Sequence, residues 1–134
     1  MSDANREVMR QLLDAYNAAE WDRLDDLVLP TYAHHNNAQT LNLAQFKRGA
    51  AWLRSAMPDF RLDIVDEVAD GNRVAIRFIG RGTHAGSLFG EAPTHKELAL
   101  HGQTFYRFED GSVAEDWEVM DEGDMRRQVG LAEA

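Results

Sequence analysis

KELALHGQTFYRFEDGSVAEDWEVMD, residues 96–121, is the stretch that decides the fold of this chain. It predicts two long strands joined at Asp110-Gly111. An Asp-Gly pair between apolar runs is the strongest short-range hairpin signal, because Gly takes a positive φ without a steric penalty. We therefore expect the two arms to be antiparallel neighbours in a sheet.

The length of the turn decides which side chains share a face. A three-residue loop that ends at Gly111 pairs His101 with Val119 and places Asp121 diagonal to His101 on one face. A two-residue loop pairs His101 with Met120 and sends His101 and Asp121 to opposite faces, because a one-residue slip inverts every side chain. We favour the three-residue loop because it gathers aromatic walls and a few polar groups, the composition of ligand pockets. The residues on this face are His101, Gln103, Phe105, Trp117, Val119 and Asp121.

Three helices are predicted before this hairpin, because apolar residues recur there at three- and four-residue steps. The first spans residues 3–20. The second is shorter, at 21–28, and Pro30 marks its end. The third begins at Asn42, a residue type that caps helices, and ends before Pro58.

The remaining segments alternate between strands and turns. Residues 32–37 form a short strand or turn, and residues 60–68 and 74–79 form a second hairpin of alternating apolar residues. A Gly-containing loop at 87–95 precedes the principal hairpin and is either a pocket rim or a crossover. A short helix at 124–129 ends the pattern.

Helices first and antiparallel strands later predict an α+β fold. We expect one domain, residues 1–134, in which a cone-shaped, curved antiparallel (mixed) sheet packs on the three N-terminal helices and encloses a pocket.

Composition excludes several classes of partner. The net charge is -9, and the 14 Lys and Arg form no run, which argues against nucleic acid. Without Cys, thiolate metal sites and disulfides are excluded. No apolar run approaches the roughly 20 residues that cross a bilayer, so we expect no membrane partner and a cytoplasmic location.

Four pieces of the chain carry a family resemblance: His35-Asn36, AMPDFRLDIVDEVADGNRVAIRF (56–78), GTHAG (82–86) and FEDGSVAEDWEVMDEGDMRRQVG (108–130). With the order of helices and sheet, they make the chain similar to the nuclear-transport-factor-2-like cone fold. More narrowly, the chain resembles the SnoaL-like polyketide cyclase (ester cyclase) family. The most specific piece is the last, in which Asp121 follows Trp117 by four residues.

The resemblance implies an intramolecular aldol ring closure with no metal or organic cofactor, and its acid/base aspartate corresponds to Asp121. This chain departs from the family pattern at Asp116, where relatives often have His before the tryptophan. A carboxylate in an apolar wall favours its protonated form, which suits general acid/base work. The alternative is that Asp121 only caps the last short helix.

The candidate catalytic residues are therefore Asp121 and His101. The candidate substrate-binding residues are polar groups and aromatic walls: Tyr16, His35, Asn36, His84, Gln103, Phe105, Trp117 and Val119. His101 and Gln103 either orient Asp121 or form cross-strand hydrogen bonds. We expect no metal site, because the adjacent His34 and His35 point to opposite faces of an extended segment.

Three functions stay open. The first is a cofactor-free cyclase or isomerase that acts on a small hydrophobic, polyketide-like carbonyl compound. The second is a dehydratase or hydrolase in the same pocket, and the third is a non-catalytic small-molecule binder or dimerisation module. We also expect a homodimer through the outer sheet face, where Leu100 and Tyr106 alternate away from the predicted pocket.

Overall fold

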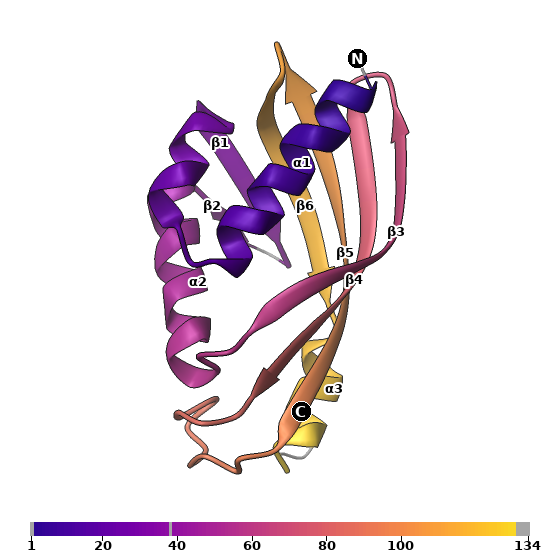
Figure 1. Ribbon diagram of the computed structural model, residues 1–134. Coiled ribbons are helices and arrows are strands. Elements are labelled where there is room, and N and C mark those ends of the chain that lie inside the picture. The colour runs from indigo at the N-terminus through magenta and orange to yellow at the C-terminus, as the bar shows by residue number, and fades with distance from the viewer. Residues whose placement is uncertain (1, 38, 131–134) are drawn as a thin grey trace.

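A curved, six-stranded sheet with helices packed on one face forms the computed structural model of the chain, which describes residues 2–37 and 39–130 (Figure 1). The strand order is β2-β1-β6-β5-β4-β3. Among the described strands, β1 and β6 alone pair in parallel, and the other neighbours are antiparallel. The predicted α+β class and the mixed, curved sheet are confirmed.

The elements follow the predicted order with one addition. They are α1 (Ser2–Asn17), the 3₁₀ helix η1 (Trp21–Asp26), β1 (Val28–Asn36), β2 (Gln39–Leu41), α2 (Leu43–Ala56), β3 (Arg61–Asp70), β4 (Arg73–Thr83), β5 (Glu97–Glu109), β6 (Ser112–Met120) and α3 (Glu122–Gln128). The addition is β2, a three-residue edge strand that was not among the predicted elements.

The second predicted helix is wrong at its end. It stops at Asp26, and β1 begins at Val28 and passes through Pro30. The pairing of β1 with β6 is irregular between Val28 and Ala33. Proline is tolerated there because no regular ladder requires its missing N–H.

The helices pack as their sequences indicate. Asn42 caps α2 through a reciprocal capping box with Gln45, as the polar residue before the apolar stripe indicates. In Figure 1, α1 runs obliquely across the sheet, and α2 stands beside it near β1 and β2. The core between the helices and the sheet includes Met9, Phe60 and Phe78, which are almost fully buried. No helix in the described ranges is both long and apolar enough to cross a membrane.

The turn of the principal hairpin has two residues, so the three-residue loop is wrong. Glu109 pairs with Ser112, and Asp110 and Gly111 between them have φ values of 50° and 83°. Two successive positive φ values are typical of the tight turns that match the twist of a hairpin. The register then shifts, because Phe108 pairs with Val113 whereas Arg107 pairs with Glu115. Ala114 is therefore an extra residue, a β-bulge.

The bulge gives a register that neither predicted loop gives, with Gln103 opposite Val119 and Phe105 opposite Trp117. The predicted set from His101 to Asp121 does share a face, but the prediction that this face lines the pocket is wrong. Phe105, Trp117 and Val119 are 43%, 39% and 67% exposed. The opposite, even-numbered face of β5 packs inward.

Gly102 shows why the even-numbered face is the inner one. It pairs with Phe78 on β4, whose side chain is fully buried in the core. A Cβ at residue 102 would lie 2.4 Å from Cζ of Phe78, so the aromatic ring occupies the space that a larger side chain would need. Leu100 and Tyr106 lie on this inner face and are buried. The prediction that these two residues form an outer dimer surface is therefore wrong.

The outer face carries a different apolar row. Cross-strand partners place Val68, Ala75, Phe105, Trp117 and His35 side by side on five consecutive strands. The ring of His35 stacks on Trp117 with centroids 5.2 Å apart, and Arg73 lies over the ring of Phe105. An apolar row across a sheet face is a surface that a second copy can cover. The homodimer therefore stays a prediction, with these residues in place of Leu100 and Tyr106.

We predict that the chain sediments as a dimer at micromolar concentration and that Phe105→Glu shifts it to monomer. The new carboxylate would lie in the middle of the row and would be desolvated in the dimer. In the monomer the adjacent Arg73 can pair with it, so the melting temperature should change little. Sedimentation velocity of both proteins tests this. A parent chain that is monomeric at micromolar concentration would contradict the prediction.

Candidate active site

A cavity of about 290 Å³ lies between the helices and the inner face of the sheet. Its walls are mostly apolar side chains from α1, α2 and β5, such as Leu13, Leu53 and Leu100. A small polar group from β1, β5 and β6 interrupts this lining: His34, Asn36, Thr104, Asp116 and Glu118. A few convergent polar groups in an apolar cavity are typical of small-molecule sites.

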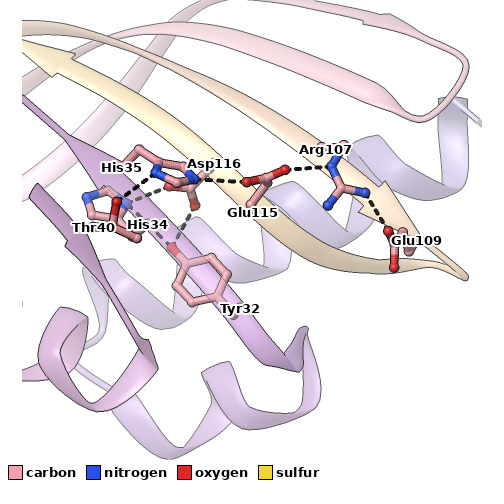
Figure 2. A network of polar contacts seen from close by, with 8 residues as sticks. All are labelled: Tyr32, His34, His35, Thr40, Arg107, Glu109, Glu115 and Asp116. Carbon is pink, nitrogen blue, oxygen red and sulfur yellow. Dashed lines mark hydrogen bonds and ion pairs between the residues drawn. The ribbon is translucent and has the colours of Figure 1, made fainter.

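The polar group is centred on a buried pair from two parallel strands. His34 lies opposite Asp116 in the register of β1 and β6, and both side chains are only 4% exposed. His34 Nδ1 is 2.5 Å from Oδ1 of Asp116, and the Tyr32 hydroxyl donates to Oδ2 at 2.6 Å (Figure 2). Each carboxylate oxygen of Asp116 thus accepts one hydrogen bond. Because Nδ1–H of His34 donates to Asp116, Nε2 is on the side of the ring that points away from it.

Glu118 lies next to this pair on the same inner face of β6. Its Oε1 is 3.9 Å from Nε2 of His34, and its Oε2 accepts a hydrogen bond of 3.2 Å from Thr104. The Glu118 side chain is 15% exposed. Burial raises the pKa of Glu118 from its ordinary 4.5 to about 6, and the charge of His34 opposes this rise while that of Asp116 adds to it.

The pKa of His34 moves in the direction that its carboxylate partner sets. Burial alone lowers the pKa of His34, but the hydrogen bond to Asp116 and the charges of Asp116 and Glu118 outweigh burial, so the pKa is raised above 6.5. A carboxyl group with its pKa raised to about 6 and an imidazole with a raised pKa are therefore adjacent in one cavity. This arrangement suits general acid/base catalysis.

Tyrosine hydroxyls complete the polar wall. Burial and the charge of Glu118 raise the pKa of Tyr16, and burial and the charge of Asp116 raise the pKa values of Tyr32 and Tyr106. All three stay neutral phenols and can donate hydrogen bonds. The Tyr16 hydroxyl has no hydrogen-bond partner among the described residues, although its side chain lines the cavity and is 7% exposed.

The two residues predicted as catalytic lie outside this cavity. Asp121 is exposed and caps α3, since its Oδ1 accepts from the backbone N–H of Asp124 at 2.9 Å. His101 is exposed on the outer face, and its carbonyl accepts from the backbone N–H of Asp121. No desolvated wall surrounds Asp121 among the described residues, because the odd-numbered residues of β5 face outward and the bulge at Ala114 turns those of β6 outward as well.

Two of the predicted substrate-binding residues line the cavity, namely Tyr16 and Asn36. His84 is fully buried at the base of the loop before β5, where its Nδ1 accepts the backbone N–H of Thr94. The other five lie on the outer face of the sheet: His35, Gln103, Phe105, Trp117 and Val119. His35 there bonds to Thr40 and Glu115, and Glu115 continues to Arg107 (Figure 2).

Five residues of the polar wall were not among the predicted site residues: Tyr32, His34, Thr104, Asp116 and Glu118. The alternation along β5 was a usable signal, because its apolar residues are even-numbered at Leu98, Leu100 and Phe108. Thr104 has the same parity and therefore the same face. No comparable signal reveals Asp116 and Glu118, because the bulge at Ala114 breaks the alternation of β6.

Comparisons with known proteins agree with this architecture. The family model of the SnoaL-like polyketide cyclase matches residues 6–129. The aklanonic acid methyl ester cyclase AcmA of Streptomyces galilaeus is 25% identical over 126 residues, which cover 91% of this chain and 88% of that protein.

Solved structures share the whole fold. AclR of Streptomyces galilaeus, a suggested hydroxylase, has a TM-score of 0.91 at 22% identity and covers 100% of this chain and 89% of its own. IdmH of Streptomyces antibioticus, a suggested polyketide cyclase, has a TM-score of 0.86 at 23% identity over 95% of this chain and 99% of its own. At these identities the likeness shows the fold alone.

We predict that Asp116→Asn lowers the pKa of His34. The amide keeps an acceptor for Nδ1–H but removes the charge of Asp116, which together with the hydrogen bond and the charge of Glu118 outweighs burial. Because the folded pKa of His34 is raised, the pair stabilises the fold below the unfolded pKa of about 6.5, and this contribution is lost as pH rises through the folded value. The variant should therefore lose more stability at acid pH than at alkaline pH.

An NMR titration of the His34 ring in both proteins measures this shift. Glu115→Gln is the matched control, because it removes a carboxylate from the outer face of the same strand. An unchanged His34 titration in Asp116→Asn would contradict the assigned pair.

Proposed function

Because this chain belongs to the SnoaL-like polyketide cyclase family, we propose that it is a cofactor-free acid/base enzyme that closes a ring in a small hydrophobic carbonyl compound. One observation carries the proposal: Glu118, with its pKa raised to about 6, shares an apolar cavity with the His34–Asp116 pair. The likeness to AcmA supports an ester of a polyketide-like acid as the substrate class.

The proposed reaction is an intramolecular aldol addition. The Glu118 carboxylate removes a proton from the carbon next to one carbonyl, and the resulting enolate carbon attacks a second carbonyl carbon of the same molecule. A carbon–carbon bond forms, and the second carbonyl oxygen becomes an alkoxide that takes a proton. The product has the atoms of the substrate, so the reaction needs no oxidant, metal or organic cofactor.

The other cavity residues have supporting roles in this proposal. His34, protonated and held by Asp116, delivers the proton to the alkoxide through Nε2, and Tyr32 positions Asp116. The free hydroxyl of Tyr16 donates to the carbonyl that enolises. The apolar walls hold the substrate in a folded conformation, so that its two reacting carbons meet. Bringing these carbons together accounts for a large share of the barrier to ring closure.

A dehydratase or hydrolase is the second candidate. The specific observation in its favour is the Asp116–His34 contact, since a histidine oriented by a carboxylate can activate water. Mass spectrometry of the product separates these reactions, because cyclisation keeps the mass, dehydration loses one water and hydrolysis gains one.

We predict that Glu118→Gln lowers kcat by about 10² to 10⁴, the range for loss of a general acid/base group. Gln keeps the shape and an acceptor for Thr104, so substrate binding should persist. Asp121→Asn should keep its activity, because Asn caps a helix nearly as well. Loss of activity in Asp121→Asn with full activity in Glu118→Gln would restore the assignment from sequence, and Glu115→Gln controls for loss of an acidic side chain on β6.

We also predict that Glu118→Gln stabilises the fold above pH 6. The pKa of Glu118 rises from 4.5 to about 6 on folding. The folded state therefore binds more protons in this window, and the parent loses stability as pH rises through it. A shift of this size corresponds to about 2 kcal/mol. Denaturant unfolding should show the gain of the variant near neutral pH and little gain near pH 4. An equal gain at both pH values would refute the buried carboxylate.

A further inference from the structure

The charges on the cavity wall are all of one sign apart from His34. The lining includes the carboxylates of Asp116, Glu118 and Glu122, and none of the described residues that line it is Lys or Arg. With these carboxylates ionised, the lining is formally negative whether His34 is neutral or protonated. A buried charge without a full counter-charge is costly, so a cation that enters the cavity recovers part of this cost.

Two further features of the cavity favour a cation. Aromatic side chains from α1, α2, β5 and the loop before β5 line it, and the negative faces of such rings attract ammonium groups. These residues are Tyr16, Phe46, Trp52, Phe89 and Tyr106. Arg126 already lies over the ring of Phe89, so Phe89 adds little to this attraction. In addition, Tyr16 lines the cavity, and its hydroxyl has no hydrogen-bond partner among the described residues. A polar group of a ligand can therefore bond to it.

We propose that this cavity binds small hydrophobic compounds that carry a protonated amine, with the ammonium group against the carboxylate of Glu118. This inference rests on the proposed function in that it uses the same cavity and the same glutamate. The inference goes beyond the proposed function because such amines would occupy the site without containing the two carbonyl groups that the ring closure needs. They should compete with any substrate.

The groups around Glu118 determine how binding depends on pH. His34 and Tyr32 face it from β1, Asp116 from its own strand, Tyr16 from α1 and Glu122 from α3. Thr104 and Tyr106 face it from β5, and α2 contributes apolar lining residues and no titratable one. Because its pKa is raised, His34 gains charge first as pH falls, and Glu118 is protonated as pH falls through about 6. Both changes should weaken the binding of an ammonium ion.

The test uses three probes with one skeleton: 1-naphthylmethylamine, 1-naphthylmethanol and 1-naphthoate. In calorimetry near pH 7.5 we expect the amine to bind about tenfold tighter than the alcohol, and the carboxylate to bind more weakly than the alcohol. Glu118→Gln should abolish the preference for the amine and leave the alcohol within about twofold. The matched control, Glu115→Gln, should keep the full preference.

Equal affinities for amine and alcohol, or a preference that survives in Glu118→Gln, would overturn the inference. If the variant does not fold, the parent protein still provides a test. Near pH 6 the amine should release protons from Glu118 on binding, which calorimetry in two buffers of different ionisation enthalpy detects. Binding without proton release would also count against the inference.

The two proposals fail separately. Probe binding involves no turnover, so a protein that prefers the amine but converts no carbonyl compound refutes only the proposed function. An active cyclase that binds the amine no better than the alcohol refutes only the preference for ammonium ions.

Discussion

One extra residue in β6, Ala114, determines which side chains of that strand face the cavity. Val113 points into the core opposite Phe108, and both are almost fully buried. In a regular strand, residues of the same parity as Val113 would also point inward. The bulge at Ala114 inverts the parity, so Asp116 turns into the cavity and Trp117 turns out. The polar wall of the site therefore depends on a local irregularity of the backbone.

The inversion acts together with the parallel pairing of β1 and β6. That pairing places His34 beside Asp116, and the next inward residue, Glu118, reaches Nε2 of the same imidazole. Each buried charge costs free energy of desolvation, and hydrogen bonds from Tyr32, His34 and Thr104 offset part of it. The carboxylate of Glu118 is the least compensated. Its raised pKa means that the ionised carboxylate destabilises the fold near neutral pH. Such a loss of stability in exchange for reactivity is common in active sites.

The sequence predicted the architecture far better than the site. Helical periodicity, the Asn42 cap and the Asp110-Gly111 turn are local signals, and each was found near its expected place, although the second helix ends earlier and the turn is one residue shorter than predicted. The face of the hairpin is not a local property, because it depends on a bulge that no residue type announces. We chose the face by its aromatic content, but Phe105 and Trp117 belong to an outer apolar row. Asp121 was correctly anticipated only in its alternative role as a helix cap.

Strand β6 also shows that burial, and not residue type, separates a site from a surface contact. His35–Glu115 on the outer face and His34–Asp116 on the inner face come from adjacent residues of the same two strands. The outer side chains are 29% and 25% exposed, and the hydrogen bond with His35 helps to lower the pKa of Glu115. Exposed pairs of this kind are worth about 1 kcal/mol or less. Three residues on, burial drives the pKa of Glu118 in the opposite direction. The same strand thus carries one glutamate that stays ionised as part of a surface network and one that can exchange a proton near neutral pH, and only the second faces a cavity in which a substrate could use it.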